Sequence, residues 1–193
     1  MKSLAESLLL LLFYSAPASA QTGPARGDHE LELWTGGGHS AGGGVGGISV
    51  WNVGLRYGWI LTSTHGPEFL RGQFEYAVDV VPVFWVFEPK GTAYGFVLDP
   101  IVLKWDFRTR GRVVPYLEIS GGTLFTSRDV PPGISWVNFA SGGAVGFYLP
   151  GKKHAWSAEL RYTHISDAGL TTPNPGTNTF QVRLGFSSFG HHQ

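Results

Sequence analysis

The chain has 193 residues with 14 basic and 14 acidic side chains, 28 glycines, no cysteine and a single methionine, Met1. Zero formal charge excludes the basic surface typical of nucleic-acid binding, and the lack of cysteine excludes a disulfide scaffold and a thiolate metal site. Scarce lysine combined with 14% aromatic residues suits a membrane-facing surface better than a water-facing one.

The first residues are typical of an export signal. A short apolar run over 8–13 follows Lys2, and small residues at 18–20 form a cleavage site. The run is shorter than the roughly 20 apolar residues that a membrane-spanning helix needs. We therefore predict a signal peptide over 1–20 and an exported domain over 21–193; the alternative is a buried amphipathic helix.

The rest of the chain alternates as β-strands do. In 48–61, for example, Trp51, Val53 and Leu55 face one way, opposite Asn52 and Arg56. No apolar period of 3.6 residues persists over three turns. The predicted strands are 29–36, 48–61, 69–82, 94–107, 112–124, 136–149, 155–166 and 178–187. We expect an all-β fold, an eight-stranded antiparallel up-and-down β-barrel.

The apolar faces of such a barrel have two possible directions. A soluble carrier of small ligands would turn them inward, and an outer-membrane barrel would turn them outward. The opposite faces mix charges of both signs, such as Arg71, Glu75 and Asp79, with small residues such as Gly54. Mixed charges can pair inside a narrow lumen, and glycine leaves room there. The sequence therefore favours a transmembrane barrel of the outer membrane.

The predicted connections differ in length. Tight ones, as in periplasmic turns, are expected at 62–68, 108–111 and 150–154. Longer ones, as in extracellular loops, are expected at 37–47, 83–93, 125–135 and 167–177. With the N-terminus in the periplasm, the strand 155–166 runs outward and ends near the outer rim.

Two glycine-rich patterns resemble known motifs. Residues 38–42 spell G-x-S-x-G and residues 42–47 spell G-x-G-x-x-G, but each motif requires a helix immediately afterwards. A strand follows here, so we predict a flexible loop. The seven histidines have no metal-site spacing, and we expect neither a metal nor an organic cofactor.

The strand 155–166 carries an unusual pair. Trp156, Leu160 and Tyr162 share one face with His164 and Ser166, since side chains alternate along a strand. A potential base and nucleophile thus lie on the face that meets hydrocarbon. This placement is typical of an enzyme acting on lipid.

A hairpin centred on Thr171 would pair His164 with Asn178. The same register makes four wholly apolar pairs: 162 with 180, 160 with 182, 158 with 184 and 156 with 186. Opposed residues have Cβ atoms about 4.5–5.5 Å apart, so Asn178 would reach His164. A serine, a histidine and a third orienting group form an activated nucleophile.

The run His-Ile-Ser-Asp-Ala-Gly at 164–169 resembles the signature His-x-Ser-Asn-Ala-Gly of the lipid A 3-O-deacylase family. Members are outer-membrane barrels that remove an ester-linked 3-hydroxyacyl chain from lipopolysaccharide with a Ser–His–Glu triad. The specific part of the resemblance is confined to residues 161–180.

The resemblance implies that His164 is the base, Ser166 the nucleophile and lipid A of the outer leaflet the substrate. Asn178 stands where the family has its glutamate. Asp167 replaces an asparagine linked to the oxyanion hole, which backbone N–H groups from Asp167 to Gly169 would then form. The alternative is a catalytically silent outer-membrane barrel with a structural or surface-binding role. Asn178→Glu would separate the two, because only a hampered catalyst would gain rate. The sequence indicates no oligomeric state.

Overall fold

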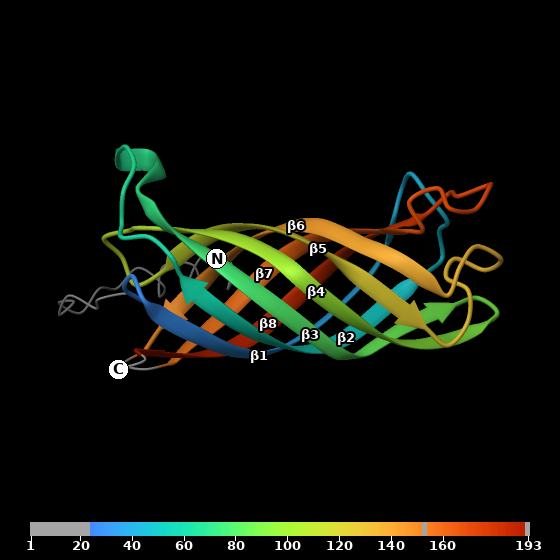
Figure 1. Ribbon diagram of the computed structural model, residues 1–193, viewed down its shortest axis with the longest axis horizontal. Helices are drawn as coiled ribbons and strands as arrows, with labels where there is room; N and C mark the ends of the chain where they lie inside the picture. Colours follow the sequence, from blue (N-terminus) through green and yellow to red (C-terminus); the bar gives the residue numbers. More distant parts are fainter. Residues whose placement is uncertain (1–23, 152–153, 192–193) are drawn as a thin grey trace, which may run out of the picture.

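The computed structural model describes residues 24–151 and 154–191, so the expected signal peptide at 1–20 lies outside the described residues. The described chain forms eight strands and one short 3-10 helix, η1 (Glu68–Leu70). The strands are β1 (Asp28–Ala41), β2 (Ser49–Ile60), β3 (Gly72–Glu88), β4 (Gly91–Phe107), β5 (Val114–Thr126), β6 (Val137–Pro150), β7 (His154–Ser166) and β8 (Thr177–His191). They wrap into an elongated cylinder (Figure 1).

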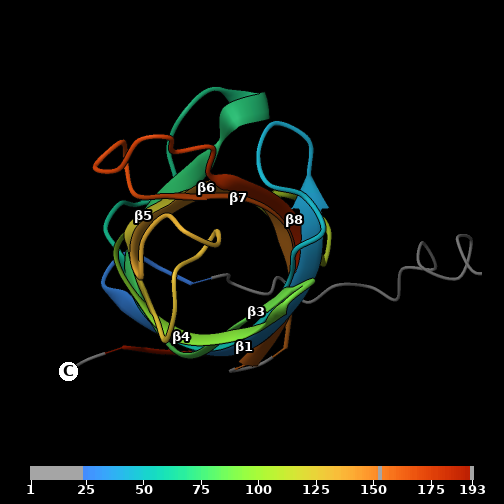
Figure 2. The same ribbon diagram turned by 90° about the vertical axis from the view of Figure 1, so that its right-hand side faces the viewer.

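Each strand pairs antiparallel with its neighbour in sequence, and β1 pairs with β8 to close the barrel. The view along the barrel shows the closed ring (Figure 2). Closure leaves no strand edge unpaired, which a barrel needs where there is no water to bond free N–H and C=O groups. The predicted eight-stranded antiparallel barrel is confirmed.

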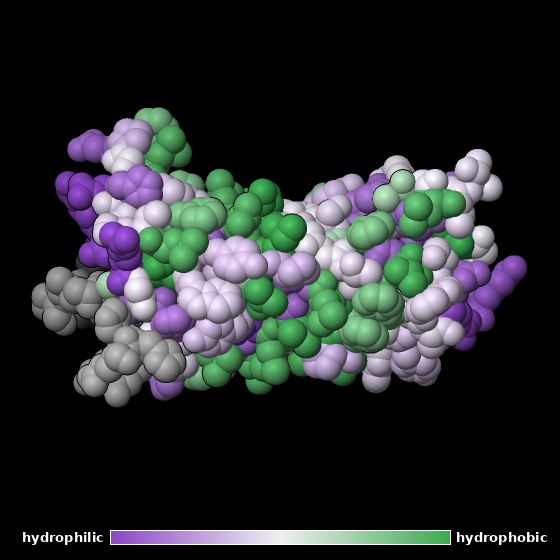
Figure 3. All heavy atoms as spheres, viewed as in Figure 1, coloured by the Kyte–Doolittle hydropathy of each residue, from purple (hydrophilic) through white to green (hydrophobic). Residues whose placement is uncertain are grey.

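Large apolar side chains point outward. On β7, Trp156 is 63% exposed and Leu160 51%, whereas Glu159 and Arg161 on the other face are buried. Hydrophobic residues cover much of the middle of the visible side, and hydrophilic ones gather toward the ends (Figure 3). This polarity is that of a membrane-spanning barrel and the reverse of a soluble carrier.

Aromatic side chains pack together on the outside near both ends. Trp59 stacks on Tyr76 near the end of β2, with ring centroids 5.6 Å apart. Trp51 packs on Trp85 near the start of β2, at 5.1 Å. Two aromatic belts of this kind mark the two interfaces of a membrane barrel.

The lumen contains a buried ionic network. Arg56, only 1% exposed, donates hydrogen bonds to Asp79 at 2.7 and 2.9 Å and to Glu118 at 2.7 and 3.0 Å. Lys104 donates to Glu30 at 2.8 Å, and Arg161 pairs with Glu118. The expected charge pairing across a narrow lumen is thus confirmed.

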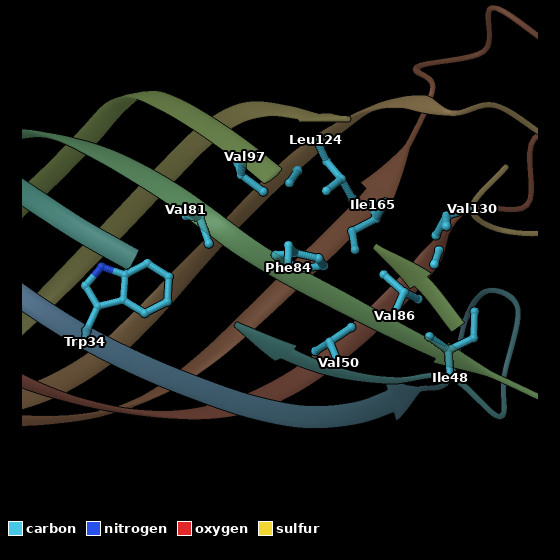
Figure 4. Packing of buried hydrophobic residues seen from close by; sticks show 12 residues of the cluster. Trp34, Ile48, Val50, Val81, Phe84, Val86, Val97, Leu124, Val130 and Ile165 are labelled. Carbon is cyan, nitrogen blue, oxygen red and sulfur yellow. The ribbon is translucent and has the colours of Figure 1, made fainter. Parts of the chain in front are cut away.

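The lumen also holds an apolar cluster, toward the end that carries the β7–β8 loop (Figure 4). Its members include Trp34, Phe84, Val97, Leu124 and Ile165. Register shifts in β3, between Val81 and Phe84, bring Phe84 and Val86 inward. The expectation of polar inward faces was therefore wrong for this part of the lumen.

Glycine makes room for the largest of these side chains. A Cβ on Gly54 would lie 2.2 Å from the ring of Trp34, so only glycine fits opposite this indole. The guanidinium of Arg183 lies 3.5 Å from the centroid of a Trp34 ring and links the apolar cluster to the ionic network. Side chains therefore pack across the lumen at the level of Trp34 and Arg183.

The connections differ from the predicted ones in three places. β3 and β4 run on through the expected loop 83–93 and leave only residues 89–90 between them. The connection expected to be tight at 62–68 spans 61–71 and contains η1. β1 extends to Ala41, so His39 and Ser40 lie in a strand and not in the expected loop. The C-terminus and η1 lie at one end of the barrel, opposite the β7–β8 loop (Figure 1).

No helix in residues 24–151 and 154–191 is long and apolar enough to cross a membrane. Over the same residues, no group of three or more His, Cys, Asp and Glu side chains could hold a metal ion.

Candidate active site

The β7–β8 hairpin has the predicted register. His164 pairs with Asn178, and the four apolar pairs below them also form. Tyr162 and Phe180, the nearest of these pairs, pack edge to face with ring centroids 5.6 Å apart. The apolar ladder fixes the register, because a one-residue slip would turn every side chain to the other face.

Ser166, His164 and Asn178 form one hydrogen-bonded line. The hydroxyl of Ser166 lies 3.0 Å from Nε2 of His164, and Nδ1 of His164 lies 2.7 Å from Oδ1 of Asn178. His164 is half-buried, and Ser166 is 9% exposed. The structure thus brings together the three residues predicted from the sequence, at the loop end of the barrel.

The orientation of the Asn178 amide follows from its other contacts. Its NH₂ group donates to the carbonyl oxygens of Gly42 at 3.0 Å and Gly43 at 2.9 Å. Only the amide oxygen then remains to face His164, and it must accept a hydrogen bond from an N–H at Nδ1. Nε2 therefore carries the lone pair and accepts the Ser166 hydroxyl proton, as a general base requires.

Gly176 allows the β7–β8 loop to close over these groups. Its φ of +61° favours glycine. A Cβ there would lie 2.9 Å from Cε1 of His164 and 3.3 Å from Cβ of Ser166. Any side chain at 176 would push directly on the imidazole.

Asp167 organises the turn after Ser166. Its carboxylate accepts hydrogen bonds from the hydroxyl of Thr171 at 2.6 Å and from the N–H groups of Gly169 and Thr171 at 3.0 and 2.8 Å. These donors, the hydroxyl first, lower the pKa of Asp167 below its usual value. The N–H of Gly169, expected in an oxyanion hole, is thus already bonded to Asp167. Ala168 between them has a positive φ of 57°.

An apolar groove runs along the outer surface beside the line. Its lining includes Leu117, Ile119, Gly143, Tyr162 and Phe180. The last two form the pair next to His164 and Asn178 in the β7–β8 ladder. The groove therefore adjoins the line through the Tyr162–Phe180 pair, and Ser166, His164 and Asn178 are not among its lining residues.

Sequence reasoning missed Gly42 and Gly43. The glycine-rich run was predicted as a flexible loop, whereas here it is bonded to Asn178. Because the contacts are made by backbone carbonyls, no side-chain pattern could have indicated them. What brings them to Asn178 is the pairing of Ala41 with Asn178, because this pairing extends β1 up to the glycine-rich run.

Comparisons with known proteins agree with this architecture. The model of the lipid A 3-O-deacylase (PagL) family matches residues 50–187. The crystal structure of the outer membrane enzyme PagL is similar with a TM-score of 0.60 at 17% identity, covering 80% of this chain and 97% of that one.

Two other surface or outer-membrane proteins have a similar fold. Neisserial surface protein A has a TM-score of 0.56 at 16% identity, covering 86% of this chain and 99% of its own. The outer membrane protein OprG from Pseudomonas aeruginosa has 0.50 at 12%, with 88% and 99% covered. At these identities the likeness shows the fold alone, and the curated proteins gave no match. The family match extends over most of the barrel and includes all of β7, so this chain belongs to the lipid A 3-O-deacylase family.

Proposed function

We propose that this protein is an outer-membrane esterase that removes an ester-linked 3-hydroxyacyl chain from lipid A of lipopolysaccharide. The observation that carries the proposal is the hydrogen-bonded line Ser166–His164–Asn178 at the loop end of the barrel, beside the apolar groove of its outer surface. Membership of the deacylase family supports the same substrate class.

The reaction begins at the hydroxyl of Ser166. Its oxygen attacks the ester carbonyl carbon while Nε2 of His164 takes the proton, and the imidazolium then delivers this proton to the departing sugar alcohol. A water molecule next attacks the acyl-serine ester, again through His164. The products are a free 3-hydroxy fatty acid and lipid A with a free hydroxyl.

Asn178 does the orienting work of the third residue. In serine proteases, changing the triad aspartate to asparagine costs about 10⁴ in kcat, because the histidine takes the wrong tautomer. That loss does not carry over directly, since the Asn178 NH₂ is already bonded to two carbonyls and its oxygen faces Nδ1. The amide selects the useful tautomer, although it stabilises the imidazolium less than a carboxylate would.

The oxyanion needs N–H donors near Ser166. The sequence predicted these donors among the backbone N–H groups from Asp167 to Gly169, but the N–H of Gly169 already donates to the Asp167 carboxylate. We assign the role to the N–H groups of Asp167 and Ala168, which precede it in the turn. The positive φ of Ala168 aims this short segment differently from a continuing strand.

The substrate arrives laterally from the outer leaflet. The line lies at the loop end, which in a barrel with periplasmic termini faces the outside. Lipid A is anchored there by its acyl chains, and the apolar groove provides a surface along which one chain can lie. Passage through the packed lumen is unnecessary.

Mass spectrometry of lipid A tests the proposal. Cells producing the protein should yield lipid A lighter by one 3-hydroxyacyl chain, and Ser166→Ala should abolish this loss while retaining a heat-modifiable barrel. An unchanged lipid A in cells with abundant folded protein would reject the proposal in favour of a silent barrel.

A further inference from the structure

The glycine-rich β1–β2 loop lies directly against the candidate active site. β1 continues to Ala41, which pairs with Asn178 on β8, so the chain leaves the sheet beside the third residue of the line. The next two residues, Gly42 and Gly43, accept both protons of the Asn178 NH₂ group. Both lie outside residues 50–187, which match the family model.

Further contacts hold the loop in this place. The N–H of Val45 donates to the carbonyl oxygen of Gly176 at 2.9 Å, and the hydroxyl of Thr177 donates to the carbonyl oxygen of Val45 at 3.0 Å. Gly44 approaches so closely that a Cβ there would lie 2.8 Å from the oxygen of Gly176. The loop is thus fixed to the two residues that precede Asn178.

We infer that the β1–β2 loop positions the catalytic line through Asn178, and this inference rests on the proposed function. The carbonyls of Gly42 and Gly43 hold the NH₂ group, so the amide oxygen can face only His164. Nδ1 then keeps its proton and Nε2 stays free for Ser166. Asn178 is a positioning residue. A carboxylate at 178 would have no proton to donate to the two carbonyls, so this geometry does not support the gain in rate that the sequence led us to expect from Asn178→Glu.

The loop offers a matched pair of variants. Gly44→Ala places a Cβ against the backbone of Gly176 and must push the β1–β2 loop away from this end of the β7–β8 loop. Gly46→Ala lies in the same loop, its Cβ would meet nothing within 4 Å, and its φ is not in the left-handed region. Both substitutions remove one glycine, and only the first disturbs the contact.

We expect Gly44→Ala to lower kcat about tenfold or more with little change in KM, the effect of losing one or two hydrogen bonds that act on the base. Gly46→Ala should stay within about twofold of the native rate. Placed in an Asn178→Leu background, Gly44→Ala should have no further effect, because the residue through which the loop acts is gone. Equal rates for the two alanine variants, or the same loss in the Asn178→Leu background, would overturn the inference.

The tautomer of His164 gives a reading that does not depend on activity. In ¹⁵N-histidine spectra of the folded barrel, with His164 assigned by its loss in His164→Ala, the neutral ring should carry its proton on Nδ1. The native protein and Gly46→Ala should show the same His164 tautomer. In Gly44→Ala the tautomer equilibrium should shift toward the form that carries its proton on Nε2. A native protein that releases no acyl chain but shows this pattern would refute the proposed function alone, whereas a tautomer indifferent to Gly44→Ala would refute the positioning role.

Discussion

In the proposed mechanism the hydroxyl of Ser166 is an ordinary alcohol, and its reactivity depends on how the neighbouring imidazole is held. His164 is fixed from two sides, by the Asn178 oxygen at Nδ1 and by the close backbone of Gly176 at Cε1. Small displacements at either contact change the 3.0 Å distance from Nε2 to the hydroxyl. A misplacement of about 1 Å can cost on the order of 10² in rate.

Gly176→Ala should therefore lower deacylation by at least about tenfold, because its Cβ would lie 2.9 Å from the imidazole. Gly169→Ala is the matched control: its φ of +84° imposes a similar backbone strain, but its Cβ would meet nothing within 4 Å. Initial rates on lipid A in mixed micelles provide the comparison. A loss equal in both variants would assign the effect to strain alone.

The hydrogen bonds of the Asp167 carboxylate, and with them the structure of this turn, should not change with pH across the physiological range. A carboxyl whose pKa is lowered stabilises the fold fully above its ordinary pKa of 3.8 and loses that contribution only as the pH falls through the lowered value. The amide proton shift of Thr171 should thus stay constant from about pH 8 to about pH 5 and move only below that. A titration midpoint above 3.8, absent in Asp167→Asn, would contradict the hydrogen bonds to this carboxylate.

At the level of elements, alternation in the sequence was enough to predict all eight strands and the register of the β7–β8 hairpin. That register places His164 opposite Asn178, as the structure has them. Strand ends were harder, because an inward apolar run looks like a break in the pattern. Residues 83–87 continue β3 with Phe84 and Val86 turned into the lumen, and the predicted loop there was wrong.

The strand register also predicted where the candidate site lies. The backbone contacts that hold Asn178 in place could not be predicted. His164, Ser166 and Asn178 have side chains whose chemistry is visible in a sequence. The carbonyls of Gly42 and Gly43 belong to the backbone and leave no such mark in a sequence. They reach Asn178 only because β1 runs to Ala41, beyond the predicted end of the strand at residue 36.

On the outward faces of β6 and β7, the cost of a charged side chain in stability should depend on its depth in the membrane. Leu160→Arg, at the middle of the strand, should lower the free energy of unfolding in bilayers by about 2–4 kcal/mol, whereas Leu149→Arg, near the end of β6, should cost about 0–1 kcal/mol. Both leucines are about half exposed on the outer surface. Equal costs at the two positions would contradict the placement of the barrel across a membrane.

For the whole molecule, the ionic network holds opposite walls of the lumen together. Arg56 on β2 bonds Asp79 on β3 and Glu118 on β5, which are separated along the chain but meet in the interior. Removing one member leaves buried carboxylates with less compensation. The barrel scaffold and the outer site are otherwise separate, because none of these groups contacts His164 or Ser166.

Arg56→Met should lower the free energy of unfolding by about 3 kcal/mol or more while the folded fraction keeps its rate. Arg56→Lys retains the charge without the paired hydrogen bonds and should cost less. Chemical unfolding in lipid bilayers, followed by an activity assay of the folded protein, measures both quantities. A rate that falls in parallel with stability would show that the network and the site are coupled.

Release of 3-hydroxy fatty acid from lipid A by the purified barrel in bilayers decides whether Ser166 is the nucleophile of a deacylase. Ser141 offers the control, since it is exposed on the outer surface and pairs with His164 across β6 and β7. We predict release by the native protein and by Ser141→Ala, and none by Ser166→Ala in its folded form. Release that persists in folded Ser166→Ala would contradict the assignment of this serine as the nucleophile.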